Sequence, residues 1–402
     1  MRFSFLYPLL VSSLFGIVGA SCGLASADEH TATTVFQRDS EGYKVFRIPA
    51  IVQAANGDLL AFCEARQGGD ASEIDLVLRR SSDGGKSWQP LQVVQESEDF
   101  RAFFADAVPS ITIGNPAPVV DRIDPEHRGR IWLPFTLEND RVFVTHSDDH
   151  GESWSRPREI TAEVKPEAWG WYATGPVHSI QIQNGPFRGR LVVPADHRVG
   201  PDGADDGLNG VQVIYSDDHG QTWQLGAVDD SYEDELNANE TTVVELEDGR
   251  LYFSTRDQHG KAAGTRGKAF SEDGGQTFVP AKESGYKWFV PESDVLDPPV
   301  VQCALLRVNA KSQGDPRNLI LFSGPDDNGP SGKGRSDLRL RYSTDEGNTW
   351  QDGPLIHTGP AAYSDMVKLS DGEVGVLFEA GSVGKSSYDR IDFVRCVLDT
   401  LE

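Results

Sequence analysis

Short runs of apolar residues alternate with polar, glycine-containing turns along most of the chain, and helical periodicity is scarce after the first thirty residues. Typical runs are Leu76–Leu78 and Val211–Tyr215, and each is closely followed by a turn rich in Ser, Asp and Gly. Apolar runs of this length between turn residues are typical of β-strands joined as hairpins. The pattern therefore predicts an all-β protein.

One turn sequence recurs five times as Ser-x-Asp-x-Gly-x-Ser/Thr-aromatic, with copies that begin at Ser81, Ser147, Ser216, Ser271 and Ser343. The Asp is suited to accept backbone N–H groups, the Gly permits a positive φ, and the aromatic side chain can pack between sheets. The starts are 66, 69, 55 and 72 residues apart, which leaves room for one four-stranded sheet per repeat. Roughly 375 residues after position 27 then predict a six-bladed β-propeller of four-stranded antiparallel sheets, with these turns at its hairpins.

The chain is strongly acidic, with 62 Asp and Glu residues against 37 Lys and Arg residues and a formal net charge of −25. Such a surface repels nucleic acid and anionic membranes, so neither is expected as a partner. It also repels an anionic substrate, unless a local cluster of arginines reverses the field where that substrate binds. The 38% of hydrophobic residues is enough for a substantial core.

The first 27 residues have the pattern of a secretory signal peptide. Arg2 supplies positive charge, Phe3–Val18 form an apolar segment, and Ala25–Ala27 is a small-residue cleavage site. Polar and helix-breaking residues interrupt the apolar segment, which argues against a permanent transmembrane helix. We therefore expect residues 28–402 to form a single exported propeller domain, periplasmic or secreted, without membrane insertion. Lipidation at Cys22 is the weaker alternative, because glycine stands three positions before it.

The cysteine and histidine content indicates neither a disulfide framework nor a metal centre. After the predicted signal peptide the chain keeps Cys63, Cys303 and Cys396, an odd number without CxxC spacing. Cys63 and Cys396 lie in apolar strand-like runs, which favours buried thiols, although one unassigned disulfide remains open. The nine histidines show no paired ligand spacing, and we expect no metal and no cofactor.

A second set of motifs, each present once, carries the candidate chemistry. Their charged or phenolic residues are Arg47 in Phe46-Arg47-Ile48-Pro49, Arg66 and Asp70 in 64–70, Glu240 and Arg256 in the hairpin 237–256, Arg335 before the last repeat, Tyr363 in Tyr363-Ser364-Asp365-Met366, and Glu379 at the end of the following strand. Together with the repeated turns, these motifs resemble the exo-α-sialidase (neuraminidase) family over nearly the whole chain. The repeated turns correspond to the Asp boxes, or BNR repeats, of that family, which support the fold more strongly than the chemistry.

The resemblance implies a role for each residue. It makes Arg47, Arg256 and Arg335 the three arginines that grip the substrate carboxylate. It makes Tyr363 the nucleophile, Glu240 the base beside it and Asp70 the acid/base residue. Arg66 is then a substrate contact and Glu379 the support for Arg47. Met366 departs from the leucine that the family has after its nucleophile.

These residue types suit the removal of a terminal sialic acid. The anomeric carbon of that sugar carries a carboxylate, and three planar guanidiniums offer forked donors to both of its oxygens. A carboxylate nucleophile would be repelled by this anionic centre, whereas a neutral phenol is not. Free tyrosine has a pKa of about 10, so the attack needs a base to take its proton. The expected reaction is hydrolysis of α-ketosidically linked sialic acids with net retention.

Three alternatives remain open from the sequence alone. A non-catalytic sialoglycan-binding propeller would keep the arginines without turnover, yet Tyr363, Glu240 and Asp70 are all present. A trans-sialidase, or an enzyme for a related nonulosonic acid, would keep both fold and nucleophile. An Asp-box propeller of unrelated function would need three well-placed arginines by accident. The expected partners are sialylated glycoproteins, glycolipids or oligosaccharides, and the expected state is a monomer.

Overall fold

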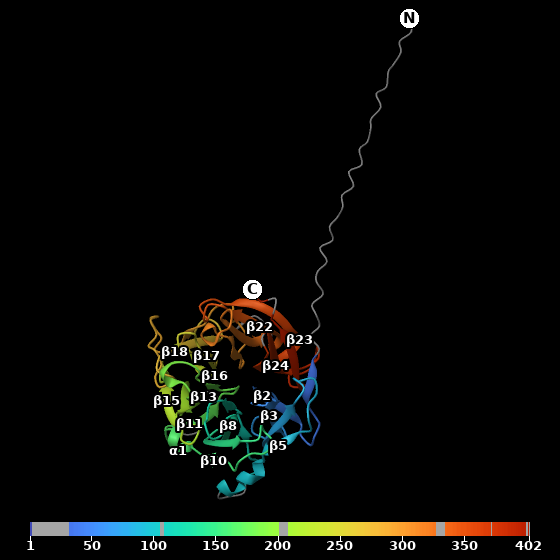
Figure 1. The fold of residues 1–402 in the computed structure, drawn as a ribbon, viewed down its shortest axis with the longest axis vertical. Helices are drawn as coiled ribbons and strands as arrows, with labels where there is room; N and C mark the ends of the chain where they lie inside the picture. The colour runs from blue at the N-terminus through green and yellow to red at the C-terminus, as the bar shows by residue number, and fades with distance from the viewer. Residues whose placement is uncertain are drawn as a thin grey trace.

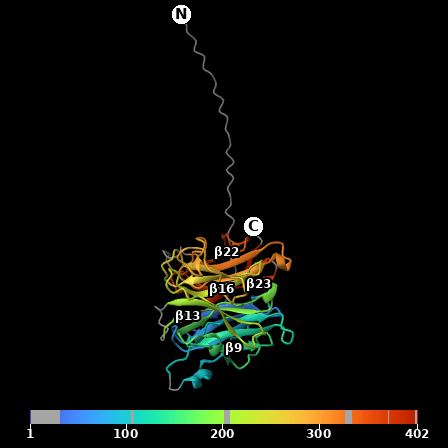
Figure 2. The same cartoon turned by 90° about the vertical axis from the view of Figure 1, so that its left-hand side faces the viewer.

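The computed structural model describes residues 32–104, 108–200, 208–326, 334–370 and 372–398, together with Met1 and Leu401. In these residues, antiparallel sheets are arranged in a ring about a central axis, seen end-on in Figure 1 and from the side in Figure 2. The all-β propeller predicted from the hairpin pattern is confirmed. Apart from Met1, the predicted signal peptide lies outside the described residues, and so does Cys22.

Four sheets of the ring are separate from one another. The first contains β2 (Val45–Gln53), β3 (Leu59–Arg66), β4 (Ile74–Ser81) and β5 (Gln92–Gln95). The second contains β6 (Ile113–Gly114), β7 (Val119–Asp121), β8 (Arg130–Leu137), β9 (Arg141–Ser147) and β10 (Arg158–Glu159). The third contains β11 (Trp169–Thr174), β12 (Ile180–Gln181), β13 (Leu191–Val199), β14 (Asn209–Ser216) and β15 (Gln224–Val228). The fourth contains β16 (Ala238–Glu245), β17 (Leu251–Asp257), β18 (Arg266–Ser271) and β19 (Val290–Pro291).

A seven-stranded sheet completes the ring as two blades that share the long strand β23 (Gln351–Ser370). The first half of β23 pairs with β22 (Ser336–Ser343), and its second half pairs with β24 (Glu373–Ala380). The remaining strands of the two blades are β20 (Ala304–Asn309) and β21 (Leu319–Pro325) on one side, and β25 (Arg390–Val397) and β1 (Thr33–Gln37) on the other. Continuous hydrogen bonding therefore gives five sheets among the described residues, while the division of β23 gives the six blades that the repeat period predicts.

The N-terminal strand β1 pairs with the C-terminal strand β25. The blade that ends the chain is thus completed by the strand that begins the described part of it. This pairing ties the two ends of the ring together, and it covers the edge of β25 that would otherwise be open.

Proline explains why two sheets have five strands rather than the predicted four. In the second sheet, β6 and β7 both pair with β8, and Asn115–Pro118 separates them. In the third, β11 and β12 both pair with β13, and Gly175-Pro176 lies between them. Because proline has no N–H to give to a ladder, one strand position is divided into two short strands.

Helical structure in the described residues is limited to short turns, which are α1 (Thr161–Val164), η1 (Ser97–Phe103), η2 (Gly185–Phe187) and η3 (Lys311–Gln313). In this part of the chain no helix has the length and apolar character needed to cross a membrane. Cys63, Cys303 and Cys396 are buried and unpaired, as the apolar runs around the first and last of them predict. The disulfide that the sequence left open does not form.

Each Asp box ties its hairpin turn together in the same way. In the first copy, Ser81 Oγ accepts the N–H of Gly85 at 2.8 Å and donates to Asp83 at 2.8 Å. Asp83 in turn accepts the backbone N–H and the hydroxyl of Ser87 at 2.9 and 2.6 Å. The same four bonds recur in the other copies. The turn role predicted for the Asp is confirmed.

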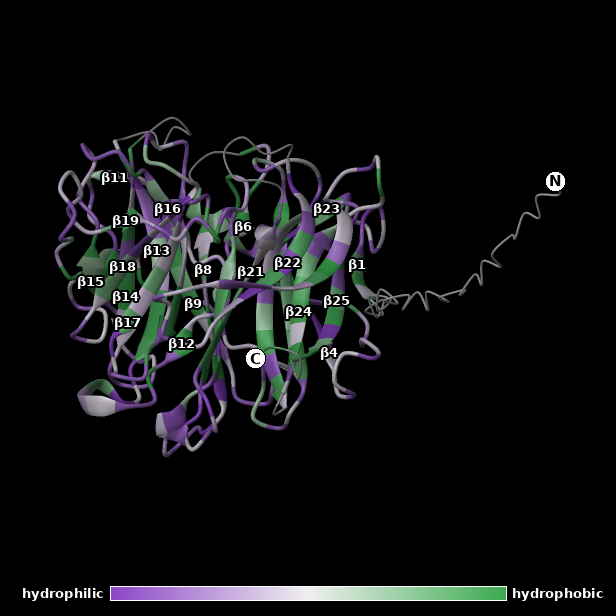
Figure 3. Cartoon of the chain, turned by 90° about the horizontal axis from the view of Figure 1, so that it is seen from above, coloured by the Kyte–Doolittle hydropathy of each residue, from purple (hydrophilic) through white to green (hydrophobic). Residues whose placement is uncertain are grey.

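The aromatic residue that ends an Asp box packs against a neighbouring blade. The Trp88 ring lies 5.4 Å from the ring of Phe393, and the Trp154 ring lies 5.7 Å from that of Phe62. The hydrophobic clusters accordingly lie between blades, and one of them combines Phe62 of β3 with Leu133 of β8. Figure 3 shows apolar residues concentrated on the strands and polar residues in the loops at both ends of the ring. The blades are therefore packed against one another, and the loops and strand ends extend from this packed ring.

Candidate active site

Seven of the eight predicted site residues line one cavity of about 630 Å³, a size typical of small-molecule sites. They come from four different blades and are Arg47, Arg66, Asp70, Glu240, Arg256, Arg335 and Tyr363. The eighth, Glu379, is fully buried and hydrogen-bonds to residues of the cavity wall. The fold thus brings the whole set together.

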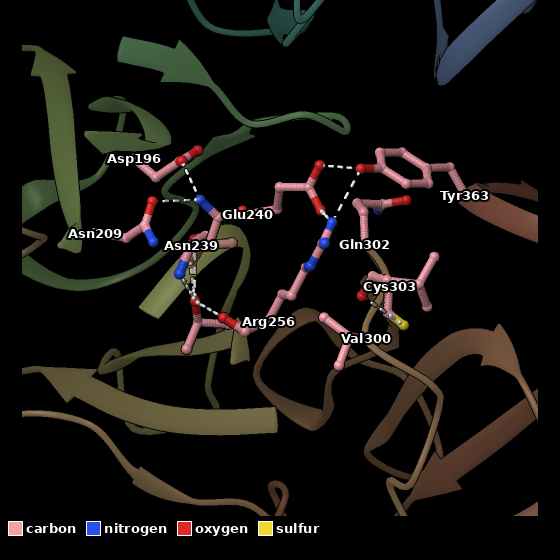
Figure 4. Close-up of polar contacts among 12 residues, drawn as sticks. Asp196, Asn209, Asn239, Glu240, Arg256, Val300, Gln302, Cys303 and Tyr363 are labelled. Atoms are coloured by element: carbon pink, nitrogen blue, oxygen red, sulfur yellow. Dashed lines mark hydrogen bonds and ion pairs between the residues drawn. The ribbon is translucent and has the colours of Figure 1, made fainter. Parts of the chain in front are cut away.

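Tyr363 is at the centre of the cluster. Its hydroxyl donates a hydrogen bond to the Glu240 carboxylate. Arg256 Nη1 donates to the same hydroxyl at 3.2 Å and to the other Glu240 oxygen at 2.8 Å, and Figure 4 shows this triangle. Only 6% of Tyr363 is exposed. The phenol is therefore held in one direction, with a proton acceptor already in contact with it.

Backbone bulges aim three of these side chains. On β16 the residues Asn239 and Glu240 together oppose the single residue Arg256 of β17. A similar shift on β23 leaves Ala362 and Tyr363 opposite Glu379. On β2 the shift follows Arg47, where the next residue has a φ of +60°. A bulge redirects a side chain out of the regular alternation of a strand, and bulges are common next to active sites.

Glu379 fixes two members of the cluster at once. One carboxylate oxygen accepts Arg47 Nε at 2.6 Å and the N–H of Ile48 at 3.0 Å. The other oxygen accepts the backbone N–H of Tyr363 at 3.2 Å. Burial alone lowers the pKa of Arg47, but the negative charge of Glu379 outweighs this effect and the pKa is raised. Arg47 is therefore a fixed cation, and the contact predicted between it and Glu379 is present.

The other arginines surround the phenol ring. The guanidinium carbon of Arg335 lies 5.5 Å from the centroid of the Tyr363 ring, and that of Arg47 lies 5.1 Å from it. Such positions attract a cation to the ring electrostatically. Arg335 Nη2 also donates to the Val300 carbonyl at 3.0 Å. Three guanidiniums thus converge on one phenol and create a local positive region in an acidic protein.

The pKa of Tyr363 is raised above its usual value. Burial is the largest cause, and the charge of Glu240 adds to it, while Arg256, Arg335 and Arg47 oppose it. The resting phenol is consequently neutral. A reaction at its oxygen needs proton transfer to Glu240, which already accepts its hydrogen bond.

Asp70 differs from the rest of the set. Its side chain is 87% exposed, in the loop that contains Gly68 and Gly69. Its carboxylate pairs with Arg66 Nη1 and lies 3.9 Å from Arg47 Nη1. Desolvation raises the pKa of Asp70, but the charges of Arg66 and Arg47 outweigh it, and the pKa is lowered. In this arrangement Asp70 is an anion bound to arginine.

Sequence reasoning missed several residues of the site, among them Tyr388 and Glu64. Tyr388 stacks under the Arg47 guanidinium at 3.9 Å, and its hydroxyl accepts Arg335 Nη1 at 2.9 Å. Nothing in its local sequence distinguishes it, because it lies in the loop between β24 and β25. Glu64 accepts Arg66 Nε at 2.8 Å and the Asn115 N–H at 2.8 Å. Glu64 could have been predicted from the sequence, because it lies two residues before Arg66 on one strand and such residues face the same side.

Potential metal ligands lie elsewhere. Of the described residues, Asp121, Asp124 and His219 are the only group whose ligand atoms come within 4.8 Å of one another. None of them lines the cavity. His219 Nδ1 is 2.7 Å from Asp121, and the same aspartate accepts the Asp124 N–H at 3.0 Å. These contacts give each of the three a structural role.

The repeated turns and the cavity belong to a known protein family. The model of the BNR repeat-like domain matches residues 48–376, which is most of the chain. The chain belongs to the BNR-repeat sialidase family. The matched residues include Arg66, Arg256, Arg335, Glu240 and Tyr363, whereas Arg47 lies immediately before them and Glu379 shortly after them.

Proteins named as sialidases resemble the chain at moderate identity. The sialidase of Micromonospora viridifaciens is 30% identical over 392 residues, which cover 91% of this chain and 54% of that protein. The exo-alpha-sialidase of Aspergillus fumigatus is 28% identical, with 87% of this chain and 83% of that protein covered. The chain therefore spans about half the length of the first relative and most of the second.

Among solved structures, the Hadza microbial sialidase Hz136 has a TM-score of 0.74 and 26% sequence identity. The match covers 92% of this chain and 69% of that one. The all-β propeller of this chain therefore resembles the fold of a microbial sialidase over nearly its whole length.

Proposed function

We propose that this protein is an exo-α-sialidase that hydrolyses terminal α-ketosidically linked sialic acids on glycoproteins, glycolipids or oligosaccharides. The observation that carries the proposal is the neutral phenol of Tyr363, hydrogen-bonded to Glu240 and surrounded by Arg47, Arg256 and Arg335. A base in contact with a phenol suits a tyrosine nucleophile, and three guanidiniums suit a carboxylate substrate. The names of the relatives support the same reaction class.

Binding begins with the substrate carboxylate. Arg47, Arg256 and Arg335 offer forked N–H donors that match its two oxygens and remain charged at any working pH. The same three charges favour the negative charge on a carboxylate that enters from an otherwise acidic surface. The anomeric carbon, which bears this carboxylate, is thereby brought to the Tyr363 hydroxyl.

The first chemical step transfers the sugar to the protein. The Tyr363 oxygen attacks the anomeric carbon while its proton passes to Glu240. The bond between the anomeric carbon and the glycosidic oxygen breaks, and that oxygen takes a proton from Asp70. The products of this step are a covalent tyrosyl sialoside and a free alcohol.

The second step releases the sugar. A water molecule attacks the anomeric carbon and loses a proton to the Asp70 carboxylate. The bond to the Tyr363 oxygen breaks, and that oxygen regains its proton from Glu240. Two inversions at one carbon give net retention of configuration.

Asp70 has to leave Arg66 and take up a proton from solvent before it can act as an acid. In the free protein the carboxylate is held by Arg66 and mostly exposed, so the glycine-containing loop around it must move when substrate binds. An incoming carboxylate competes for Arg47, which weakens one of the two contacts that hold Asp70. Arg66 is then available as a substrate contact.

The proposed site of action rests on the N-terminal sequence alone. The signal peptide proposed for residues 1–27 directs the propeller out of the cytoplasm, to the periplasm or the medium. Sialylated glycans that the protein meets there are its proposed substrates. Fractionation of expressing cells, with and without residues 2–27, tests this part.

The activity is tested with a fluorogenic aryl sialoside on the wild type and on two pairs of variants. Tyr363→Phe and Arg47→Ala should each lower kcat/KM by at least about 100-fold. Tyr215→Phe, whose hydroxyl bonds Gln224 at 3.3 Å, and Arg250→Ala, whose guanidinium bonds Asp248, are the matched controls and should retain activity. Full activity in Tyr363→Phe or Arg47→Ala would reject the site.

Transfer instead of hydrolysis is measured in the same assay. Lactose is added as an acceptor, and sialyllactose is separated from free sialic acid. Free sialic acid as the main product supports the hydrolase, whereas sialyllactose as the main product makes the protein a trans-sialidase with the same nucleophile.

A further inference from the structure

A buried aspartate on the neighbouring blade is connected to the proposed base. Asp196 of β13 is fully buried, and its Oδ2 accepts a hydrogen bond from Asn239 Nδ2 at 2.7 Å. Asn239 immediately precedes Glu240 on β16. The carboxyl of Asp196 does not line the cavity, so it can act on the reaction only through another residue.

Asn239 is the first residue of the bulge that aims Glu240. Its N–H donates to Thr255 Oγ1 at 3.1 Å, and its carbonyl accepts Thr241 Oγ1 at 2.7 Å. These two bonds hold the bulge to its own blade. Its side-chain amide points the other way and donates to Asp196 at 2.7 Å and to Asn209 Oδ1 at 3.2 Å, as Figure 4 shows. The bulge is thus held from two blades at once.

The Asp196 carboxyl is suited to a geometric role rather than to a charged one. Among the described residues its Oδ1 has no hydrogen-bond partner. Burial of an ionised carboxylate with one unpartnered oxygen costs much more free energy than burial of the neutral carboxylic acid. Burial, and next the charge of Glu240, raise the pKa of Asp196 well above its usual value. A neutral acid still accepts the Asn239 amide.

We propose that Asp196 is a positioning residue which, as a neutral carboxylic acid, fixes the Asn239 bulge through the side-chain amide and so aims Glu240 at the Tyr363 hydroxyl. The inference rests on the proposed function of Glu240 and Tyr363. The third blade supplies none of the predicted site residues, and the proposal gives it an indirect part in the chemistry through Asp196.

The test compares kcat, KM and the pH profile of kcat/KM with an aryl sialoside. Asp196→Ala removes the acceptor and should lower kcat by about 10- to 100-fold, with KM within about threefold, because the base is misplaced while the arginines are not. Asp196→Asn keeps an acceptor for the Asn239 amide and should stay within about threefold of the wild type with an unchanged pH profile. Rescue by this neutral, nearly isosteric variant is the signature of a geometric role.

A matched control separates this effect from the general loss of a buried carboxyl. Asp229 lies on the same blade, is 2% exposed, and burial raises its pKa to about 6. It accepts the Ser231 N–H at 3.0 Å and does not line the cavity. Asp229→Ala should lower thermal stability and leave kcat near the wild-type value.

A double-mutant cycle tests the route of the effect. Asn239→Ala, which leaves the Asp196 carboxyl in place, should lose as much kcat as Asp196→Ala. The double variant should be no slower than the slower single variant, since both changes break one link. Asn239→Ala also tests the link on its own if Asp196→Ala is recovered only unfolded.

The inference is overturned if folded Asp196→Ala keeps the wild-type kcat, or if the two losses multiply in the double variant. It is also overturned if Asp196→Asn loses as much as Asp196→Ala with a displaced pH profile, because charge would then be the cause. An inactive wild-type protein would reject the proposed function and this inference together. An active wild type with an unaffected Asp196→Ala rejects this inference alone.

Discussion

The Tyr363 hydroxyl and the Glu240 carboxylate are in hydrogen-bond contact, although the two residues come from β23 and β16 on different blades. Each stands at a bulge of its strand, so the path of the backbone sets the contact. Arg256 donates to both side chains and lies opposite the β16 bulge. The pair is therefore preorganised before any substrate arrives.

Replacing the base should slow the chemistry more than the binding. Glu240→Gln keeps the size of the side chain but cannot take the Tyr363 proton, so kcat should fall by about 10²- to 10⁴-fold while KM changes little. Steady-state kinetics with an aryl sialoside measure both values. Glu247→Gln, at the turn of the same hairpin, is the control and should behave as the wild type. An unchanged kcat in Glu240→Gln would remove this residue from the mechanism.

The pairing of Asp70 with Arg66 predicts a pH effect. Arg66 lowers the pKa of Asp70 in the free protein, and general acid catalysis needs the protonated form. In the pH profile for a natural sialoside, kcat/KM should therefore start to fall already at low pH, where Asp70 loses its proton. This fall is the alkaline limb of the profile. Arg66→Gln removes the charge and should move this limb to higher pH, whatever it does to KM. A limb that stays in place, or moves to lower pH, would contradict the assignment of Asp70 as the acid.

Stability should fall with rising pH because of His178. This histidine is buried, and its Nδ1 lies 2.6 Å from the fully buried Asp365. Burial lowers the pKa of His178, but the charge of Asp365 outweighs burial and the pKa is raised above 6.5. A raised folded-state pKa contributes stability that is fully present below the unfolded value of about 6.5 and is lost as pH rises through the folded value.

Thermal unfolding across the range from pH 5.5 to 9 measures this effect. His178→Gln should unfold at a lower temperature than the wild type at pH 5.5, and the difference should shrink towards pH 9. The exposed His127→Gln is the control and should follow the wild-type curve. A constant difference over the whole range would show that the ion pair does not titrate.

Two turn glycines, one inside an Asp box and one outside, predict a stability difference between two substitutions with the same backbone strain. Gly220 and Gly249 have φ values of +83° and +84°. A Cβ at Gly220 would stand 2.1 Å from the Trp132 ring, whereas one at Gly249 would meet nothing within 4 Å. Gly249→Ala should cost about 1–2 kcal/mol from backbone strain, and Gly220→Ala about 1–3 kcal/mol more from overpacking. Urea unfolding measures both, and equal losses would mean that blade packing tolerates the added methyl group.

Much of the fold and most of the site could be predicted from the sequence. The Asp boxes identify hairpin turns because each of their bonds lies within eight consecutive residues. Arg47 and Tyr363 could be found because each stands in a short motif. The sharing of β23 between two blades could not be predicted, because it depends on which partner each half of a single long strand meets.

The undetected features share a physical cause. Tyr388 reaches Arg47 and Arg335 from a loop, and Asp196 reaches Asn239 from another blade, so neither contact leaves a local pattern. The ion pair between Asp70 and Arg66 depends on the conformation of a glycine-containing loop, and residue types alone do not determine that conformation. Sequence reasoning thus predicted the candidate residues and the contact of Arg47 with Glu379, but not the contacts that Tyr388 and Asp196 make.

The central claim is that Tyr363 forms a covalent bond to the sugar. Incubation with a 2,3-difluorinated sialic acid, followed by proteolysis and mass spectrometry, tests it directly because the fluorine slows the release of the intermediate. The account predicts one added sugar per chain on the peptide that contains Tyr363, and no addition in Tyr363→Phe. A label on Glu240 or on any other residue, or a label that persists in Tyr363→Phe, would contradict it.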